Sequence, residues 1–280
     1  MSDTQRTAIV TGAAGGIGRE FVRGLLADGI RVAAVDRTAE GLEAVAANAR
    51  AAGHDAALLT IAADLAQDAA ASDIVGQTRA RFGPIDILVN NAGVGQATLR
   101  ADNWQRPLRF WEVRPDDWRR FLAVHTTAPL LLAQTVLPDM RQSGRGRIVN
   151  VTTSLGTMIR SGSPTYGPSK AALEALSAVM AKDLADSGIT VNVLVPGGVT
   201  NTGMVPAESG FDRGRMIQPA AMVPPLLWLV SDAAQNVTAR RFLAVHWDPA
   251  LPPAAAAEKA GAPIAWTDIA TMPIEPPRQA

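Results

Sequence analysis

Short apolar runs of strand length alternate with helical segments along most of this chain. The apolar runs lie at residues 7–12, 31–36, 56–64, 85–93, 146–153, 189–198 and 240–245. Helical patterns occupy residues 16–28, 40–52, 69–82, 115–142, 164–187 and 219–232. Strands separated by helices indicate βαβ units and a parallel sheet, and continuously apolar strands indicate burial on both faces. The sequence therefore predicts an α/β fold, a doubly wound sheet of seven parallel strands flanked by helices.

Two segments fall outside this alternation. Residues 94–118 contain three of the six tryptophans, and we interpret them as a loop insertion within one domain of residues 1–246. Residues 247–280 are rich in proline and alanine and form a C-terminal extension rather than an independent domain. Because proline cannot donate a ladder hydrogen bond, we expect this tail to leave the sheet and to cross onto a neighbouring subunit or cover a cleft.

Composition excludes several classes of function. The net charge is zero and the basic residues are dispersed, so we expect neither nucleic acid nor a membrane surface as a partner. The absence of cysteine excludes disulfides and thiol catalysis, and three scattered histidines make a metal site unexpected. We see neither a signal peptide nor an apolar run of membrane-spanning length, so we expect a soluble cytoplasmic protein.

The first strand ends in the glycine-rich stretch TGAAGGIG, residues 11–18. Between a strand and a helix, glycines at 12, 16 and 18 allow a tight turn and a close approach of backbone amides to a pyrophosphate. Asp36 ends the second strand, where a carboxylate can bind the ribose hydroxyls of NAD and repel the 2′-phosphate of NADP. The adjacent Arg37 could instead accommodate that phosphate, and Asp64 either touches the adenine or caps a helix.

The only tyrosine of the chain, Tyr166, lies four residues before Lys170 in a helical segment. Residues i and i+4 share one helix face, so the ammonium of Lys170 is expected beneath the phenol. A phenol has a pKa near 10, and a nearby cation favours the phenolate. This pair is therefore a candidate for acid–base catalysis near neutral pH.

Four motifs, in order and spacing, resemble those of the short-chain dehydrogenase/reductase family. They are TGxxxGIG at residues 11–18, NNAG at 90–93, YxxxK at 166–170 and PG at 196–197, and the resemblance covers residues 5–245. It implies a Rossmann-type fold and an NAD(P)-dependent oxidoreductase in which Tyr166 exchanges the substrate proton and Lys170 also contacts the nicotinamide ribose. The expected cofactor contacts are Gly12, Ala14, Gly15, Gly16, Ile17, Gly18, Asp36, Arg37, Asp64, Leu65, Asn91, Ala92, Gly93, Tyr166, Lys170, Pro196, Gly197, Val199, Thr200 and Thr202.

The chain departs from the family pattern at two catalytic positions. The position of the family's catalytic serine is occupied by Thr153, followed by Ser154; we favour Thr153 as the catalytic hydroxyl and keep Ser154 as the alternative. His125 occurs where the family has an asparagine that resembles a link in a water relay to the lysine. We interpret His125 as a proton-relay residue, with a hydrogen-bonded core histidine as the alternative.

These features predict an NAD(H)-dependent enzyme that interconverts a secondary alcohol and a ketone. The alternative is an NAD-binding scaffold or redox-responsive regulator with little turnover. We expect a hydrophobic or aromatic small-molecule substrate, although Arg100, Arg106, Arg109 and Arg114 could receive a carboxylate. From the family and the long helices we also expect a homotetramer or a homodimer. The expected substrate pocket is formed by Gly95, Leu155, Met158, Ile159, Met204, Phe211 and the tryptophans of the insertion.

Overall fold

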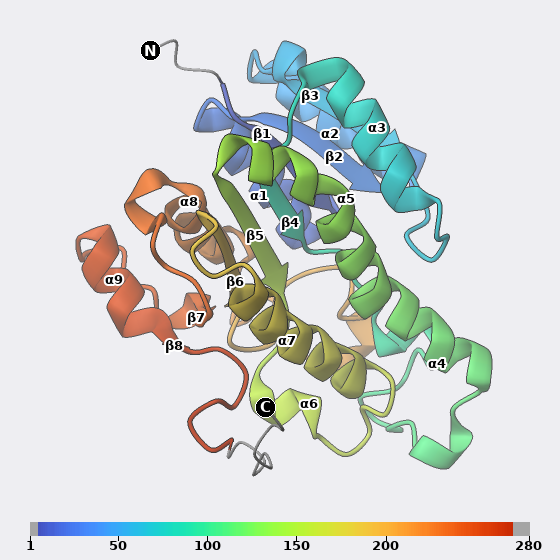
Figure 1. Ribbon diagram of the computed structural model, residues 1–280. Helices are drawn as coiled ribbons and strands as arrows, with labels where there is room; N and C mark the ends of the chain where they lie inside the picture. The colour runs from blue at the N-terminus through green and yellow to red at the C-terminus, as the bar shows by residue number, and fades with distance from the viewer. Residues whose placement is uncertain (1–4, 271–280) are drawn as a thin grey trace, which may run out of the picture.

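In the computed structural model, which describes residues 5–270, eight strands form one sheet and helices cover both its faces (Figure 1). The strands are β1 (Thr7–Thr11), β2 (Arg31–Asp36), β3 (Leu58–Ala62), β4 (Ile87–Asn90), β5 (Gly146–Val151), β6 (Ile189–Val195), β7 (Arg240–Leu243) and β8 (Gly261–Pro263). The helices are α1 (Gly16–Ala27), α2 (Ala39–Ala51), α3 (Ala70–Phe82), α4 (Pro115–Leu122), α5 (Ala128–Ser143), α6 (Leu155–Met158), α7 (Tyr166–Asp183), α8 (Val223–Val230) and α9 (Pro253–Ala260).

The strand order is β3-β2-β1-β4-β5-β6-β7-β8, and all neighbours pair in parallel except β7 and β8. The chain moves outward in one direction from β1 to β3 and in the other from β4 onward. This reversal between β1 and β4 opens a crevice at the carboxyl ends of the strands, where ligands bind in doubly wound sheets.

Two apolar cores lie on opposite faces of the sheet. In β1, Ala8 and Val10 pack on the face covered by α1, α2 and α8, whereas Ile9 packs on the face covered by α3, α5 and α7 (Figure 1). Every residue of β1, β4, β5 and β6 is buried. The predicted fold is confirmed: seven parallel strands lie between two layers of helices, so strands buried on both faces read as continuous apolar runs.

The expectation that the tail leaves the sheet is wrong for residues 261–263. β8 adds to the outer edge of β7, with Arg241 opposite Ala262 and Arg240 opposite Pro263. Proline is excluded from central strands but tolerated on an edge strand, and the preceding helix α9 anchors the segment by burying Ala257 and Ala260. Residues 271–280 lie outside the described residues.

The predicted helix of residues 115–142 is continuous but not uniform. α4 and α5 are joined by a π-helical turn over Ala123–Thr127, and such turns occur frequently at functional sites. By length and composition Pro115–Ser143 could cross a membrane, and 44% of its most apolar window is buried. Its buried side chains, including Phe121, Leu132 and Met140, pack within the protein, as expected for a core helix.

Candidate active site

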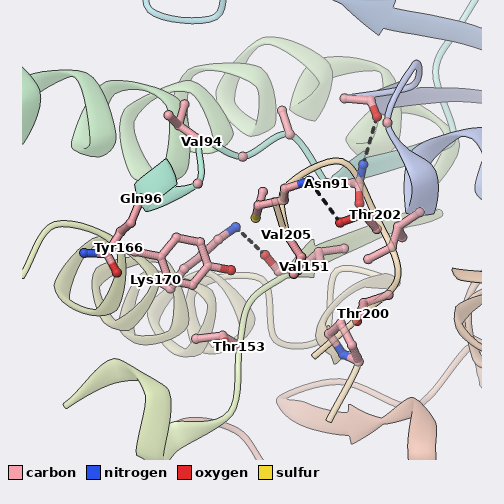
Figure 2. A pocket seen from close by; sticks show the side chains of 18 of the residues that line it. Asn91, Val94, Gln96, Val151, Thr153, Tyr166, Lys170, Thr200, Thr202 and Val205 are labelled. Carbon is pink, nitrogen blue, oxygen red and sulfur yellow. Dashed lines mark hydrogen bonds between the residues drawn. The ribbon is translucent and has the colours of Figure 1, made fainter. Parts of the chain in front are cut away.

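A cleft of about 600 Å³ lies at the carboxyl ends of the central strands. It runs from the glycine-rich turn after β1, past the ends of β2 and β3, to Tyr166 at the start of α7. Figure 2 shows Thr153, Tyr166 and Lys170 in one part of this cleft, together with Thr200 and Thr202 from the loop after β6. One continuous cavity therefore joins the expected nucleotide site to the expected catalytic residues.

The glycine-rich turn is shaped for a close approach by a phosphate. Gly12 has a φ of +65°, and a Cβ placed there would lie 2.8 Å from the Cα of Ala92. A Cβ at Gly18 would lie 2.0 Å from the carbonyl oxygen of Gly12. α1 begins at Gly16 with no capping side chain and no acidic residue in its first turn, so its first amides remain available to an anion. The turn thus fits the pyrophosphate of a dinucleotide.

Asn91 and Thr11 fasten the loop after β4 to this turn. The side-chain amide of Asn91 donates to the carbonyl oxygens of Thr11 (2.9 Å) and Gly12 (3.2 Å). The hydroxyl of Thr11 accepts the backbone N–H groups of Asn91 and Ala92 at 3.0 and 3.1 Å. The NNAG segment therefore holds the glycine turn and the floor of the cleft in a fixed relation.

Asp36 is held at the end of β2 by three hydrogen bonds. Its carboxylate accepts the N–H of Ala14 at 3.0 Å and both the N–H and the hydroxyl of Thr38 at 3.2 Å. Asp36 and Arg37 both line the cleft. The arrangement places a carboxylate at the position expected for the ribose hydroxyls, beside a guanidinium that has no hydrogen-bond partner within residues 5–270.

At the other end of the cleft, the side chains of Thr153 and Tyr166 lie near each other. Burial raises the pKa of Tyr166 above its ordinary value of 10, and the nearby hydroxyl of Thr153 opposes this shift. The ammonium of Lys170 donates to the carbonyl oxygen of Val151 at 2.8 Å (Figure 2), and burial lowers the pKa of Lys170 to about 8. Tyr166 is thus a phenol at neutral pH in the protein alone, so the structure does not show the predicted depression of its pKa.

His125 has both ring nitrogens engaged. Nε2 accepts the backbone N–H of Val94 at 2.7 Å, and Nδ1 lies 2.8 Å from the hydroxyl of Ser169. Because a backbone N–H can only donate, Nε2 carries no proton, and the proton of the neutral ring is on Nδ1. Nδ1–H therefore donates to the hydroxyl of Ser169. That hydroxyl in turn donates to the carbonyl oxygen of Tyr166 at 2.9 Å. Burial, followed by the charge of Lys170, holds the pKa of His125 well below its usual range. These contacts oppose the proton-relay interpretation and agree with the alternative, a hydrogen-bonded core histidine.

Of the expected cofactor contacts, all except Ala14 line the cleft. Ala14 instead packs against the neighbouring Gly41 and donates its N–H to Asp36. Thr153 and Ser154 both line the cleft, and Thr153 lies close enough to Tyr166 to influence the pKa of the phenol. The choice of Thr153 as the catalytic hydroxyl stays a prediction.

The expected substrate pocket is brought together only in part. Gly95 and Met204 line the cleft, and so does Trp104 of the insertion. Six other expected residues do not line it: Leu155, Ile159, Trp111 and Trp118 are exposed, Met158 is buried, and Phe211 packs edge-to-face against Trp104. Sequence reasoning missed several polar lining residues, which are Gln96, Thr98, Asn103, Arg120, Thr157 and Arg160. Except for Arg120 in α4, they lie in loops or short helical turns, where no periodicity marks the inward face.

A buried ion pair behind the site was also missed. Glu174 is fully buried and accepts hydrogen bonds from the hydroxyl of Thr152 (2.6 Å), Arg241 Nε (3.0 Å) and the N–H of Ala265 (3.0 Å). Arg241 also donates to the carbonyl oxygen of Thr153 at 3.1 Å. The sequence spacing could have indicated this residue, because Glu174 follows Lys170 by four residues and so lies on the same, inward face of α7.

Within residues 5–270, no cluster of three or more histidine, aspartate or glutamate side chains could hold a metal ion. The polar side chains that line the cleft carry hydroxyl, phenol, amide, carboxylate, ammonium and guanidinium groups.

Comparison with known proteins places the chain in a family. The model of the short chain dehydrogenase family matches residues 6–210. A 2,5-dichloro-2,5-cyclohexadiene-1,4-diol dehydrogenase of Sphingobium indicum is 30% identical, and a cis-4-hydroxycyclohexanecarboxylate dehydrogenase of Sinomonas cyclohexanicum is 33% identical. Each alignment covers 83% of this chain and 92% of the relative.

Solved structures agree with this assignment. A putative NAD(P)-dependent gluconate 5-dehydrogenase from Beutenbergia cavernae with bound NADP is 31% identical with a TM-score of 0.73, covering 85% of this chain and 94% of its own. A 3-ketoacyl-(acyl-carrier-protein) reductase from Brucella melitensis complexed with NADH is 26% identical with a TM-score of 0.71, covering 83% and 93%. The glycine turn, the cleft that holds Tyr166 and these relatives agree, and the chain belongs to the short-chain dehydrogenase/reductase family of nicotinamide-dependent oxidoreductases.

Proposed function

We propose that this protein interconverts a secondary alcohol and a ketone with NAD(H), and that Tyr166 is the acid–base group. The observation that carries the proposal is that Thr153, Tyr166 and Lys170 line the same cleft as the nucleotide-binding glycine turn. When bound, the nicotinamide supplies the hydride for reduction or accepts it during oxidation.

Tyr166 and Thr153 handle the substrate oxygen. In ketone reduction the phenol of Tyr166 donates a proton to the oxygen of the developing alkoxide, while the hydroxyl of Thr153 donates a hydrogen bond to the same oxygen. In alcohol oxidation the phenolate accepts the hydroxyl proton. Burial keeps Tyr166 protonated in the protein alone, so the acid required for reduction is present before substrate enters.

Lys170 supplies the positive charge that favours the phenolate. It lies one helical turn after Tyr166 on the same face, and its ammonium is oriented by the carbonyl oxygen of Val151. With a pKa of about 8, Lys170 is largely protonated at pH 7 and loses its charge above pH 8. We therefore expect Lys170 to stabilise the phenolate of Tyr166 most strongly below pH 8. Its support of alcohol oxidation should follow the same pH dependence.

The choice of cofactor and the substrate class are finer proposals. Asp36 supports NAD, because its fixed carboxylate matches two ribose hydroxyls and repels a 2′-phosphate. Relatives named for cyclohexadiene-diol and hydroxycyclohexanecarboxylate dehydrogenation support a cyclic secondary alcohol as substrate. The apolar walls contributed by Val94, Trp104 and Met204 fit a ring of this kind.

The test is a steady-state assay of NADH oxidation with a panel of cyclic ketones, made with native protein and with Tyr166→Phe. The substitution keeps the ring but removes the proton donor, so kcat should fall by about 10²–10⁴-fold, the usual contribution of general acid–base catalysis. NADH binding, followed by its fluorescence, should change little. Thr153→Val should also lower kcat strongly, whereas the matched control Ser154→Ala should not.

Two results would count against the proposal. Equal kcat values for native protein and Tyr166→Phe would remove Tyr166 from the proton-transfer step. Binding of NADH without turnover of any ketone or alcohol would favour the alternative of a cofactor-binding scaffold.

A further inference from the structure

We propose that the substrate end of the cleft contains an anion subsite formed by Arg160 and Arg120, and that the substrate is an alcohol or ketone that also carries a carboxylate. This inference rests on the proposed function, because it places the charged group of the substrate relative to Tyr166. The guanidinium groups of Arg160 and Arg120 both line the cleft, and neither forms a salt bridge with an acidic residue within residues 5–270.

Arg160 is held in position without being neutralised. It lies between α6 and α7, six residues before Tyr166, and it lines the cleft. Its guanidinium carbon lies 5.0 Å from the centre of the Trp104 ring, and Phe211 supports that ring edge-to-face at 4.8 Å. A cation–π contact fixes the plane of the guanidinium while its N–H donors stay available.

Arg120 contributes the second guanidinium from α4. The nearest acidic residue along that helix, Asp117, is committed to Arg114 through two hydrogen bonds of 2.7 and 3.0 Å. The guanidinium of Arg114 is also the main cause of the lowered pKa of Asp117, and Arg120 contributes only weakly. Arg120 therefore faces the cleft without a bound carboxylate of its own.

The other arginines near the insertion behave differently. Arg100 pairs with Glu112 at 2.7 Å and Arg106 with Asp102 at 3.4 Å. Arg109 bonds the hydroxyl of Ser161 at 3.2 Å, and neither it nor Arg114 lines the cleft. The arginines expected from the sequence to receive a carboxylate are thus mostly paired with acids of the protein, whereas Arg160 and Arg120 are not.

The charge distribution along the cleft is consistent with an anionic substrate. The acidic lining residues are Asp36 and Asp64, at the ends of β2 and β3 in the nucleotide part, and no acidic residue lines the part around Tyr166. A planar guanidinium binds a carboxylate through two parallel hydrogen bonds, and the adjacent Trp104 offers an apolar surface for a carbon skeleton. This combination selects a compact hydrocarbon with a reacting oxygen at one end and a carboxylate at the other.

The activity test compares 4-oxocyclohexanecarboxylate with its primary carboxamide, which has a similar shape but no charge. The native enzyme should prefer the carboxylate by at least tenfold in kcat/KM. Arg160→Gln should lower that ratio by about 10–100-fold, the range for loss of charge-assisted hydrogen bonds, mainly through KM. Arg120→Gln should lower it less. Arg109→Gln, which removes a neighbouring charge outside the cleft, should leave the ratio unchanged.

A binding measurement separates this inference from the proposed function. Cyclohexanecarboxylate and cyclohexanecarboxamide have no alcohol to oxidise, so calorimetry with NAD⁺-saturated protein reports the subsite even without turnover. The carboxylate should bind more tightly than the amide to native protein, and Arg160→Gln should abolish the difference. Equal binding of the two ligands, or an equal preference in native protein and Arg160→Gln, would overturn the subsite while leaving the oxidoreductase proposal intact.

Discussion

Asp36 and Arg37 place opposite charges side by side at the nucleotide end of the cleft, and the two side chains differ in how firmly they are held. The carboxylate is fixed by the N–H groups of Ala14 and Thr38, whereas the guanidinium of Arg37 is exposed. A fixed carboxylate repels a 2′-phosphate without any loss of side-chain entropy, while Arg37 would have to be ordered to attract one.

We therefore expect Asp36→Asn to shift the preference from NAD toward NADP. The amide oxygen can still accept the N–H of Ala14, so the glycine turn should persist while the negative charge is lost. The ratio of kcat/KM for NADP to that for NAD should rise by about 10–100-fold, corresponding to ~1–3 kcal/mol. Asp64→Asn, in the same part of the cleft, should change both cofactors alike. An unchanged ratio in Asp36→Asn would contradict the assignment to NAD.

His125 makes stability depend on pH. Its pKa in the folded protein is well below 6.5, so between the two values the unfolded chain binds a proton that the folded protein does not. Stability from this group is fully present above pH 6.5 and is lost as pH falls below it, by at most ~1.4 kcal/mol per pH unit. Protonation would place an N–H of the ring against the N–H of Val94.

The measurement is the urea midpoint at pH 7.5 and pH 5.5. Native protein should lose more stability between these pH values than His125→Asn, which cannot take up the proton. His246→Asn, at an exposed histidine, should behave like native protein. Two outcomes would contradict this prediction. One is an equal change of the urea midpoint with pH in native protein and His125→Asn, and the other is the loss of an ionisation from the pH profile of kcat in His125→Asn. In either case His125 titrates in the folded enzyme and the proton-relay role is restored.

At the scale of elements, the Glu174–Arg241 pair joins α7, the end of β5, β7 and the C-terminal extension. Glu174 is fully buried and the side chain of Arg241 is 7% exposed, so removal of either partner leaves a charge in the interior. Because Arg241 also bonds the carbonyl of Thr153, the pair supports the backbone that carries the proposed catalytic hydroxyl. The Glu174–Arg241 pair therefore links the stability of the fold to the position of Thr153.

Arg241→Met should lower the free energy of unfolding by about 3–5 kcal/mol, as expected when one partner of a buried ion pair is removed. Chemical denaturation measures this change, and addition of Glu174→Met should recover much of it. The matched control is Arg240→Met, because Arg240 lies 3.9 Å from a mostly exposed Glu258 and should contribute no more than about 1 kcal/mol. If Arg241→Met lowered the free energy of unfolding by no more than Arg240→Met, the Glu174–Arg241 pair would not stabilise the fold.

At the scale of the whole molecule, the C-terminal extension determines which surfaces remain for assembly. β8 covers the outer edge of β7, so a second copy cannot pair with that edge while the extension is in place. The predicted homotetramer or homodimer would then use a surface other than the β7 edge, and light scattering on the intact chain tests its existence.

Removal of residues 261–280 should expose the edge of β7 and change the assembly. An uncovered strand edge presents unpaired N–H and C=O groups to other chains, so we expect larger, concentration-dependent species in light scattering. A chain that ends after residue 270 keeps β8 and serves as the control. Identical molar masses for the two truncated proteins would show that β8 does not protect this edge.

The sequence by itself determined the parallel sheet, the glycine turn and the placement of Tyr166 and Lys170 on one helix, α7. Each of these is recorded locally: strands buried on both faces need unbroken apolar runs, a tight turn at a phosphate needs glycine, and residues four apart share a helix face. The resemblance to the family favours Thr153 over Ser154 as the catalytic hydroxyl, and this choice stays a prediction.

Only the tertiary structure showed the contacts of His125, the tail and the arginines. His125 is kept neutral by Val94 and Ser169, which lie 31 and 44 residues away in the chain. The tail joins β7 because α9 anchors it, and Arg160 stays unpaired because Trp104, rather than a carboxylate, lies beneath it. The physical reason is common to all three: burial and long-range contacts set the charge and partner of a side chain, and neither leaves a periodic trace in the sequence.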